Sequence, residues 1–226
     1  MEPAVGLGGA SQAGEWAGGD LVYRPGFVGE AAAAQLLRAA SDVPQSRWRT
    51  VSGRKLQNWG GQVEHGRLVP EALPGWLRAL LSRVRVEFPR AFPAELNHVL
   101  VNAYSPGQGI LPHEDGPSYQ PQVAILSLGG SAVLRFHKKG GAGEGQADAR
   151  LALSVLLEPR SLVVFQGSLY SSHLHSIDFV EEDIIDGSVI NVEDVGGEGG
   201  SVPRGRERVS FTMRRVLKTG NRFVRL

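Results

Sequence analysis

Arg208-Val209-Ser210-Phe211-Thr212-Met213-Arg214 alternates strictly between polar and apolar side chains. Successive side chains of a β-strand point to opposite faces, so this period predicts a strand with one apolar and one polar face. The polar face carries an arginine at each end. A buried guanidinium is costly unless it is paired with an anion, and its planar donors fit a carboxylate through two hydrogen bonds. We therefore predict that Arg208 and Arg214 bind a carboxylate; the alternative is that both lie on a solvated strand face.

Further strands are predicted upstream of this segment. They are short, rich in Val, Ile, Leu or Phe, and separated by turn residues; they cover 98–104, 123–128, 132–137, 151–157 and 162–165, and the last strand is expected over 209–216. Two helices precede them. Residues 29–41 join an alanine run to an apolar stripe, and residues 74–86 place leucines at helical spacing after a proline. The order predicts an α+β fold, mainly β, in which helices buttress a sandwich or barrel.

The composition excludes several classes of protein. The chain of 226 residues has no cysteine, which excludes disulfides, cysteine-based zinc sites and thiol nucleophiles. A net charge of +1 gives no general attraction to nucleic acid or anionic membranes. No apolar run approaches the length of a membrane span, and no signal peptide is recognisable. We expect a monomer of the cytoplasm and nucleus with no membrane partner.

We predict one domain over residues 20–226 behind a flexible, Ala- and Gly-rich tail at residues 1–19. Residues 138–149 are Gly-rich and predict a mobile hairpin loop. Charge is distributed unevenly: residues 46–90 carry nine Lys or Arg against three acids, and residues 178–198 carry eight acids and no base. The acidic, Gly-rich residues 181–204 predict a long insertion with little regular structure. A polyanion substrate gated by a loop fits this distribution, and solvated charged faces explain it as well.

A metal site is predicted from histidine and aspartate spacing. His113 and Asp115 are two residues apart, so in an extended segment they reach one metal together while Glu114 points away. The third ligand has to come from a distant strand. His173 and His175 are both available, and we prefer His175 because its apolar neighbours fit a buried strand. Two histidines and one carboxylate with open positions are the usual ligands of non-haem Fe(II) oxygenases.

Alternatives to this site remain open at this point. His113 and Asp115 can also form an ordinary hydrogen bond in a surface loop. Zinc is another candidate metal, and a zinc hydrolase would need a general base such as Glu114 beside the bound water. The other histidines are interpreted as surface or packing residues: His65, His98 and His137. Arg204, Arg206 and Arg215 are interpreted as solvated.

The ordered set Asn102-x-Tyr104, His113-x-Asp115, His175 and Arg208-x5-Arg214 resembles the AlkB family of Fe(II)/2-oxoglutarate dioxygenases. The likeness covers roughly residues 20–217. Four fragments match one branch of the family more closely: 52–61, 97–102, 112–117 and 157–162. As a set these motifs are specific, although each alone is not. The long acidic stretch between His175 and Arg208 departs from AlkB, and it is expected either to cover the active site or to recruit a partner.

The resemblance implies a double-stranded β-helix (jelly-roll) core over residues 96–217 and helices with a nucleotide-recognition region over residues 20–95. It implies Fe(II) and O2 as cofactors, with 2-oxoglutarate as co-substrate. The implied iron ligands and catalytic residues are His113, Asp115 and His175. Asn102, Tyr104, Arg208 and Arg214 are implied to surround 2-oxoglutarate, with Arg208 on its distal carboxylate.

The leading functional hypothesis is oxidative demethylation of an alkylated RNA or DNA base that is flipped or unpaired. Trp48, Trp59 and Tyr119 are candidate stacking surfaces, and nearby cations are candidate phosphate contacts: Arg47, Arg49, Arg54 and Lys55. Packing over the sheet is an equally good explanation of the two tryptophans. Competing hypotheses are a dioxygenase acting on a protein or small molecule, and a non-catalytic module that binds modified nucleic acid.

Overall fold

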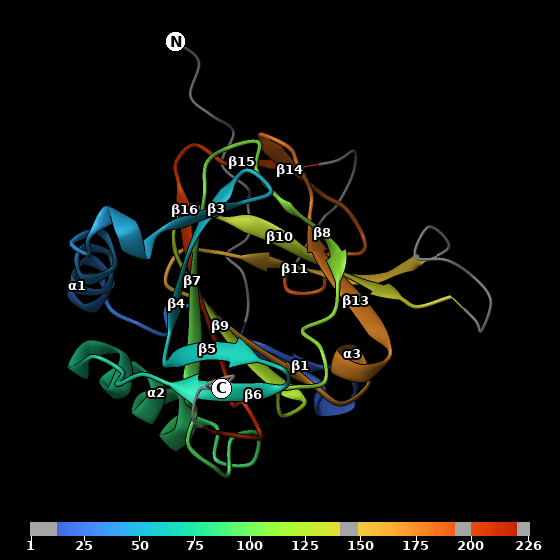
Figure 1. Ribbon diagram of the computed structural model, residues 1–226. Helices are drawn as coiled ribbons and strands as arrows, with labels where there is room; N and C mark the ends of the chain where they lie inside the picture. Colours follow the sequence, from blue (N-terminus) through green and yellow to red (C-terminus); the bar gives the residue numbers. More distant parts are fainter. Residues whose placement is uncertain (1–12, 141–148, 193–199, 221–226) are drawn as a thin grey trace.

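The computed structural model describes residues 13–140, 149–192 and 200–220. Two antiparallel sheets pack against each other, and helices cover the outer face of the larger one (Figure 1). The larger sheet has the order β1-β2-β12-β9-β16-β7-β4-β3. Its strands are β1 (Gly14–Trp16), β2 (Leu21–Arg24), β12 (Leu162–Gln166), β9 (Gln122–Gly129), β16 (Arg208–Arg214), β7 (His98–Tyr104), β4 (Arg54–Trp59) and β3 (Arg49–Val51).

The smaller sheet has the order β11-β10-β13-β8 and lies over the other face of the larger sheet. Its strands are β11 (Arg150–Leu157), β10 (Ala132–Lys138), β13 (His173–Ile177) and β8 (Ile110–His113). Phe136 of β10 and Phe165 of β12 meet edge to face between the sheets, with ring centroids 5.2 Å apart. Such aromatic pairs add to the burial energy of a core. This inter-sheet core closes one end of the space in which the site lies.

Two helices form a second core against the larger sheet. α1 (Glu30–Ser41) and α2 (Gly75–Glu87) pack there, and α2 buries Leu77, Leu80, Leu81 and Val84, one stripe at helical spacing. Each such burial stabilises the fold by about 1.5–3 kcal/mol. Figure 1 shows both helices on the side away from the smaller sheet. Short helical turns occur as η1 (Ala17–Gly19), η2 (Gln45–Arg47) and α3 (Gly167–Ser171).

Two hairpins flank the sandwich. β5 (Gly61–Glu64) pairs with β6 (Arg67–Pro70), directly after β4. β14 (Glu182–Ile185) pairs with β15 (Gly200–Pro203) beside the smaller sheet, where Ile185 and Val189 pack on Val133 and Leu156. Among the described residues, no helix is both long and apolar enough to span a lipid bilayer.

Most predicted elements agree with the structure. β7 begins and ends where expected, the other predicted core strands differ by a residue or two at their ends, and both long helices are present. Residues 49–59, outside the strands predicted above, form the β3–β4 hairpin.

Two predictions about the chain's periphery need correction. Within the predicted tail 1–19, β1 pairs with β2 and so extends the larger sheet, because Trp16 packs on the inter-sheet core; residues 1–12 lie outside the described residues. The acidic insertion 181–204 forms the β14–β15 pair, because Asp183 and Ile185 alternate inward. Most of the glycine-rich segment 138–149 also lies outside the described residues, as do 193–199.

Candidate active site

Neighbouring strands of the smaller sheet bring the three predicted metal ligands together. His113 ends β8 and is the register partner of His175 on β13, and Asp115 follows two residues after His113. One ligand atom from each of the three side chains lies within 4.8 Å of the others. The Nδ1 atom of His113 donates to the carbonyl oxygen of Leu111 at 2.8 Å, which leaves its Nε2 lone pair free for a metal. The geometry is that of a two-histidine, one-carboxylate face.

The site holds these groups in the protonation states that a cation requires. Burial lowers the pKa of His175 to about 4, and burial also lowers the pKa of His113, so both imidazoles are neutral at pH 7. Burial alone would raise the pKa of Asp115, but the Arg214 cation and the two imidazoles hold it below its usual range. Two neutral nitrogen donors and one carboxylate therefore face a common point.

A buried arginine without an acidic partner lies across the cavity from these ligands. Arg208 is 3% exposed and donates one hydrogen bond, from Nη2 to the Ser127 hydroxyl at 2.8 Å. Within the described residues its Nε and Nη1 atoms have no partner. Burial lowers the pKa of Arg208 to about 10, so the guanidinium remains charged at pH 7. Its carbon lies 5.5 Å from the ring centroid of Tyr104. An anion would complete this environment.

The second predicted arginine is partly satisfied by the protein. Arg214 forms a buried ion pair with Asp115 and lies over the ring of Tyr119, 4.1 Å from its centroid. Its Nε and Nη2 atoms, and Oδ2 of Asp115, lack partners in the part of the chain that the structure describes. Arg214 therefore orients the carboxylate of the metal-binding group and keeps two donors for a further ligand.

One cavity of about 230 Å³ joins the metal-binding group to both arginines. β7 contributes Asn102 and Tyr104, which face Ser210 and Arg208 of β16 across the sheet. All seven residues predicted for metal and 2-oxoglutarate line it: Asn102, Tyr104, His113, Asp115, His175, Arg208 and Arg214. The unpaired donors of Arg208 lie at one end of the cavity, and the two imidazoles and the carboxylate lie at the other. This arrangement fits a keto-diacid that chelates a metal ion. The residues present therefore fit Fe(II) with 2-oxoglutarate.

Among the candidate substrate contacts, Arg54, Lys55, Trp59 and Tyr119 divide into residues that line the cavity and residues that do not. Arg54 and Tyr119 line the cavity, and Nε of Arg54 donates to Oδ1 of Asn102 at 3.4 Å. Trp59 lies on the opposite face of β4, is 9% exposed, and packs edge to face on Trp76 of α2. Lys55 is exposed, with the same parity along β4 as Trp59. Trp59 therefore packs against α2, the alternative that the sequence left open, and neither Trp59 nor Lys55 lines the cavity.

Several other residues differ from expectation or were missed. Glu114 lies outside the metal-binding group, as predicted, and pairs with Lys139 at 2.9 Å, although it also lines the cavity. Nδ1 of His173 contacts the Ser168 carbonyl, so His173 is not part of the metal-binding group. Ser127 was missed, although a lone hydroxyl within the apolar run 123–128 is a signal for a polar partner. Arg204 was interpreted as solvated but is 5% exposed.

Comparison with known proteins agrees with this geometry. Residues 43–214 match the model of the 2OG-Fe(II) oxygenase superfamily. The "Probable RNA/DNA demethylase ALKBH6" of Danio rerio is 38% identical over 204 residues, which cover 88% of this chain and 86% of the relative. The chain belongs to the AlkB family of 2OG-Fe(II) oxygenases. It is an oxidoreductase that uses Fe(II), 2-oxoglutarate and O2. The predicted resemblance to this family is confirmed, and the branch that the four fragments match is the one of this relative, ALKBH6.

Solved structures support the fold of this AlkB-family oxygenase. "The structure of OsALKBH1" superposes with a TM-score of 0.56 at 13% identity, and covers 87% of this chain and 96% of the other. A 2OG-Fe(II) oxygenase family oxidoreductase from Burkholderia pseudomallei gives 0.52 at 15% identity, with coverage of 90% and 88%. The predicted α+β, mainly β fold with a jelly-roll core is confirmed, as an open pair of sheets rather than a closed barrel.

Proposed function

We propose that this oxygenase removes methyl groups from alkylated bases of RNA or DNA by oxidative demethylation. In this proposal His113, Asp115 and His175 hold Fe(II), and Arg208 binds the distal carboxylate of 2-oxoglutarate. Asn102, Tyr104 and Arg214 complete the co-substrate's surroundings. One observation carries the proposal: a single cavity has the two-histidine, one-carboxylate group at one end and a buried guanidinium with unpaired donors at the other.

The chain's own residues act by positioning and by excluding water. Fe(II) supplies the oxidising chemistry, in which 2-oxoglutarate and O2 give succinate and CO2 while the methyl carbon leaves as formaldehyde. Arg208 fixes one end of the co-substrate, so the other end meets the metal in a single orientation. Arg214 holds Asp115 in its ionised state and thereby keeps a carboxylate available to the cation. Apolar walls from both sheets, including Ile125 and Leu134, keep bulk water from the reacting centre.

Two observations favour nucleic acid as the substrate. The Danio rerio relative carries the name of a probable RNA/DNA demethylase. The β3–β4 hairpin carries several cations: Arg54 lines the cavity, and Arg49 and Lys55 are exposed elsewhere on the same hairpin. Cations in this place suit the phosphates that flank a base inserted into the cavity. Of the three candidate stacking residues, Trp48, Trp59 and Tyr119, it is Tyr119 that lines the cavity.

The decisive experiment combines turnover with product analysis. A panel of methylated RNA and DNA oligonucleotides is incubated with the enzyme, Fe(II), 2-oxoglutarate and O2, and mass spectrometry follows loss of the methyl group. We expect at least one methylated base to be demethylated and to stimulate succinate formation. His113→Ala should abolish both signals, with Glu114→Gln as the control on the neighbouring carboxylate, which pairs with Lys139 and is not part of the metal-binding group. Turnover by His113→Ala at the wild-type rate would end the assignment.

The same assay separates the competing hypotheses. Stimulation of succinate formation by peptides or metabolites, but not by nucleic acid, would keep the oxygenase and replace the substrate. Stable binding of modified nucleic acid without succinate formation would make the protein a binding module. Filter binding across a salt series adds an independent measurement, because phosphate contacts make affinity fall as the salt concentration rises. Affinity independent of salt would contradict contact by the β3–β4 hairpin.

A further inference from the structure

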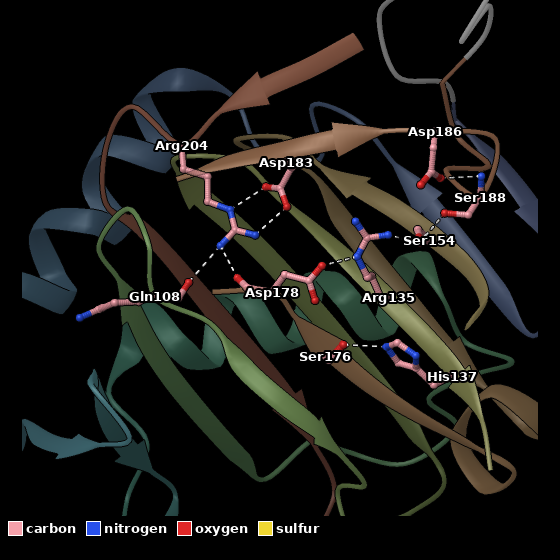
Figure 2. Close-up of polar contacts among 10 residues, drawn as sticks. All are labelled: Gln108, Arg135, His137, Ser154, Ser176, Asp178, Asp183, Asp186, Ser188 and Arg204. Carbon is pink, nitrogen blue, oxygen red and sulfur yellow. Dashed lines mark hydrogen bonds and ion pairs between the residues drawn. The ribbon is translucent and has the colours of Figure 1, made fainter. Parts of the chain in front are cut away.

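A buried ion pair joins Arg204 and Asp183 outside the metal-binding group (Figure 2). The two side chains are 5% and 1% exposed, and two parallel hydrogen bonds of 2.6 Å link the guanidinium to the carboxylate. Bidentate contacts of this kind fix the orientation of both side chains. Asp183 lies on β14 and Arg204 directly follows β15, so the pair links the two strands of this hairpin.

The remaining donor of Arg204 reaches two other segments. Its Nη1 atom donates to the carbonyl oxygens of Gln108 at 3.0 Å and Asp178 at 2.8 Å. Asp178 in turn accepts a hydrogen bond of 2.7 Å from Nε of Arg135 on β10 (Figure 2). Arg204 therefore connects the β7–β8 loop at Gln108, the chain after β13 at Asp178, and the chain that leads into β16. We call Arg204, Asp183, Gln108 and Asp178 the Arg204 cluster.

The cluster also reaches the β3–β4 hairpin. Nε2 of Gln108 donates to the carbonyl oxygen of Gly53 at 2.7 Å, and its Oε1 accepts from the backbone of Ser105 at 2.8 Å. Gly53 lies in the turn of that hairpin with φ +86, a conformation that favours glycine. Arg54, the next residue, lines the main cavity. A contact path thus runs from the buried ion pair to the rim of the cavity.

The cluster adjoins the arginine proposed to bind 2-oxoglutarate. Arg204 and Gln108 line one small cavity together with Tyr104 and Arg208. Only four positions separate the two arginines along the chain. On the other side, Gly130 donates to the Glu207 carbonyl at 3.0 Å and leaves no room for a side chain. The chain between Arg204 and Arg208 is therefore held from both sides where it enters β16.

We propose that the Arg204–Asp183 ion pair is a positioning element that fixes the end wall of the co-substrate slot, and so selects the length of the dicarboxylate that Arg208 binds. The inference rests on the proposed role of Arg208. In this view the paired strands β14 and β15 are a structural part of the co-substrate site. Neither Arg204 nor Asp183 touches the reacting atoms, and both act through the placement of Arg208 and the β7–β8 loop.

The test measures KM and kcat for 2-oxoglutarate and for 2-oxoadipate, which is one methylene longer, in Arg204→Lys and Asp183→Asn. Lysine keeps the charge but cannot make the parallel bonds, and asparagine keeps the shape of aspartate. We expect KM for 2-oxoglutarate to rise roughly threefold to thirtyfold with kcat little changed. We also expect discrimination against 2-oxoadipate to relax. Arg206→Met is the control, because it removes an exposed cation two residues from Arg204.

Folding is checked separately, because breaking a buried pair destabilises proteins. The double variant Arg204→Met with Asp183→Leu removes both charges and leaves no unpaired ion; it should show the same relaxed selectivity. Folded variants with wild-type KM and wild-type discrimination would overturn the inference, as would a fall in kcat with KM unchanged. Arg208→Lys separates the two proposals. If it raises KM while the Arg204 cluster variants do not, only the positioning role fails; if it leaves KM unchanged, the proposed function of Arg208 fails.

Discussion

Arg204 and Arg208 are close in sequence and both are nearly fully buried, yet their surroundings are opposite. The protein completes Arg204 with the Asp183 carboxylate and two backbone carbonyls. It gives Arg208 one serine hydroxyl, and among the described residues leaves two of its nitrogen atoms without partners. A fully satisfied buried cation indicates structure, whereas an unsatisfied one indicates a ligand site. The contrast therefore separates a structural arginine from a binding arginine without reference to any relative.

The largest expected effect is on stability. Arg204→Met leaves Asp183 as an unpaired buried carboxylate and should lower the free energy of unfolding by about 3–5 kcal/mol. Arg208→Met removes a cation that has no acidic partner, so the metal-free protein should lose no stability. Urea unfolding of both variants, without metal or 2-oxoglutarate, measures the difference. Equal losses in the two variants would break the comparison.

The next effect concerns binding and reverses the order of the two arginines. Arg208→Met should weaken 2-oxoglutarate binding by about 1.5–3 kcal/mol, the contribution of hydrogen bonds to a charged group, or roughly tenfold to more than a hundredfold in Kd. Anaerobic calorimetric titration of the metal-loaded protein measures it. Arg206→Met is the matched control for the loss of one positive charge. If both substitutions weaken binding equally, general electrostatic attraction rather than direct contact explains the effect.

His98 extends the comparison to a third buried group. Both its ring nitrogens lack partners among the described residues, and burial, reinforced by Arg214, lowers its pKa to about 3. The unfolded chain therefore takes up a proton between about pH 6.5 and pH 3 that the folded protein refuses. Stability from this group is fully present above pH 6.5 and should fall by up to about 1.4 kcal/mol per pH unit below it. His98→Leu should show a shallower acid dependence in urea unfolding; identical slopes would refute the assignment.

The smallest effect is expected at the surface. Glu114 and Lys139 form a pair whose side chains are 50% and 30% exposed. Exposed pairs contribute about 1 kcal/mol or less. Glu114→Gln should therefore change stability within that range and leave 2-oxoglutarate turnover intact. Loss of turnover with retained metal binding would instead show that Glu114 takes part in turnover.

The sequence predicted the residues that line the cavity better than the candidate substrate contacts around it. The alternation in 208–214 and the spacing of His113 and Asp115 depend on strand parity, which is a local property, so these side chains face the cavity as expected. Parity does not say which face of a strand meets which layer. The sequence of β4 therefore left open that Trp59 packs under α2 while Arg54, of opposite parity, faces the cavity.

Long-range pairing explains the remaining differences. Arg204 looked solvated because its partner Asp183 lies 21 positions away, in a stretch whose acidic composition is typical of an exposed loop. The pairing of β1 with β2 is likewise invisible in an Ala- and Gly-rich segment, since Trp16 is its main apolar anchor. In each case the structural role depends on a partner, Asp183 or β2, that only the folded chain brings into contact.

β8 is the edge strand of the smaller sheet and pairs with β13 on one side only. Its last residue, His113, lies opposite His175 of β13. A cation bound by both imidazoles would therefore hold β8 against β13. Metal binding and the stability of the β8–β13 pairing are then thermodynamically linked. Amide hydrogen exchange along Ile110–His113 should slow when the ion is bound, which makes this short strand a built-in reporter of metal content.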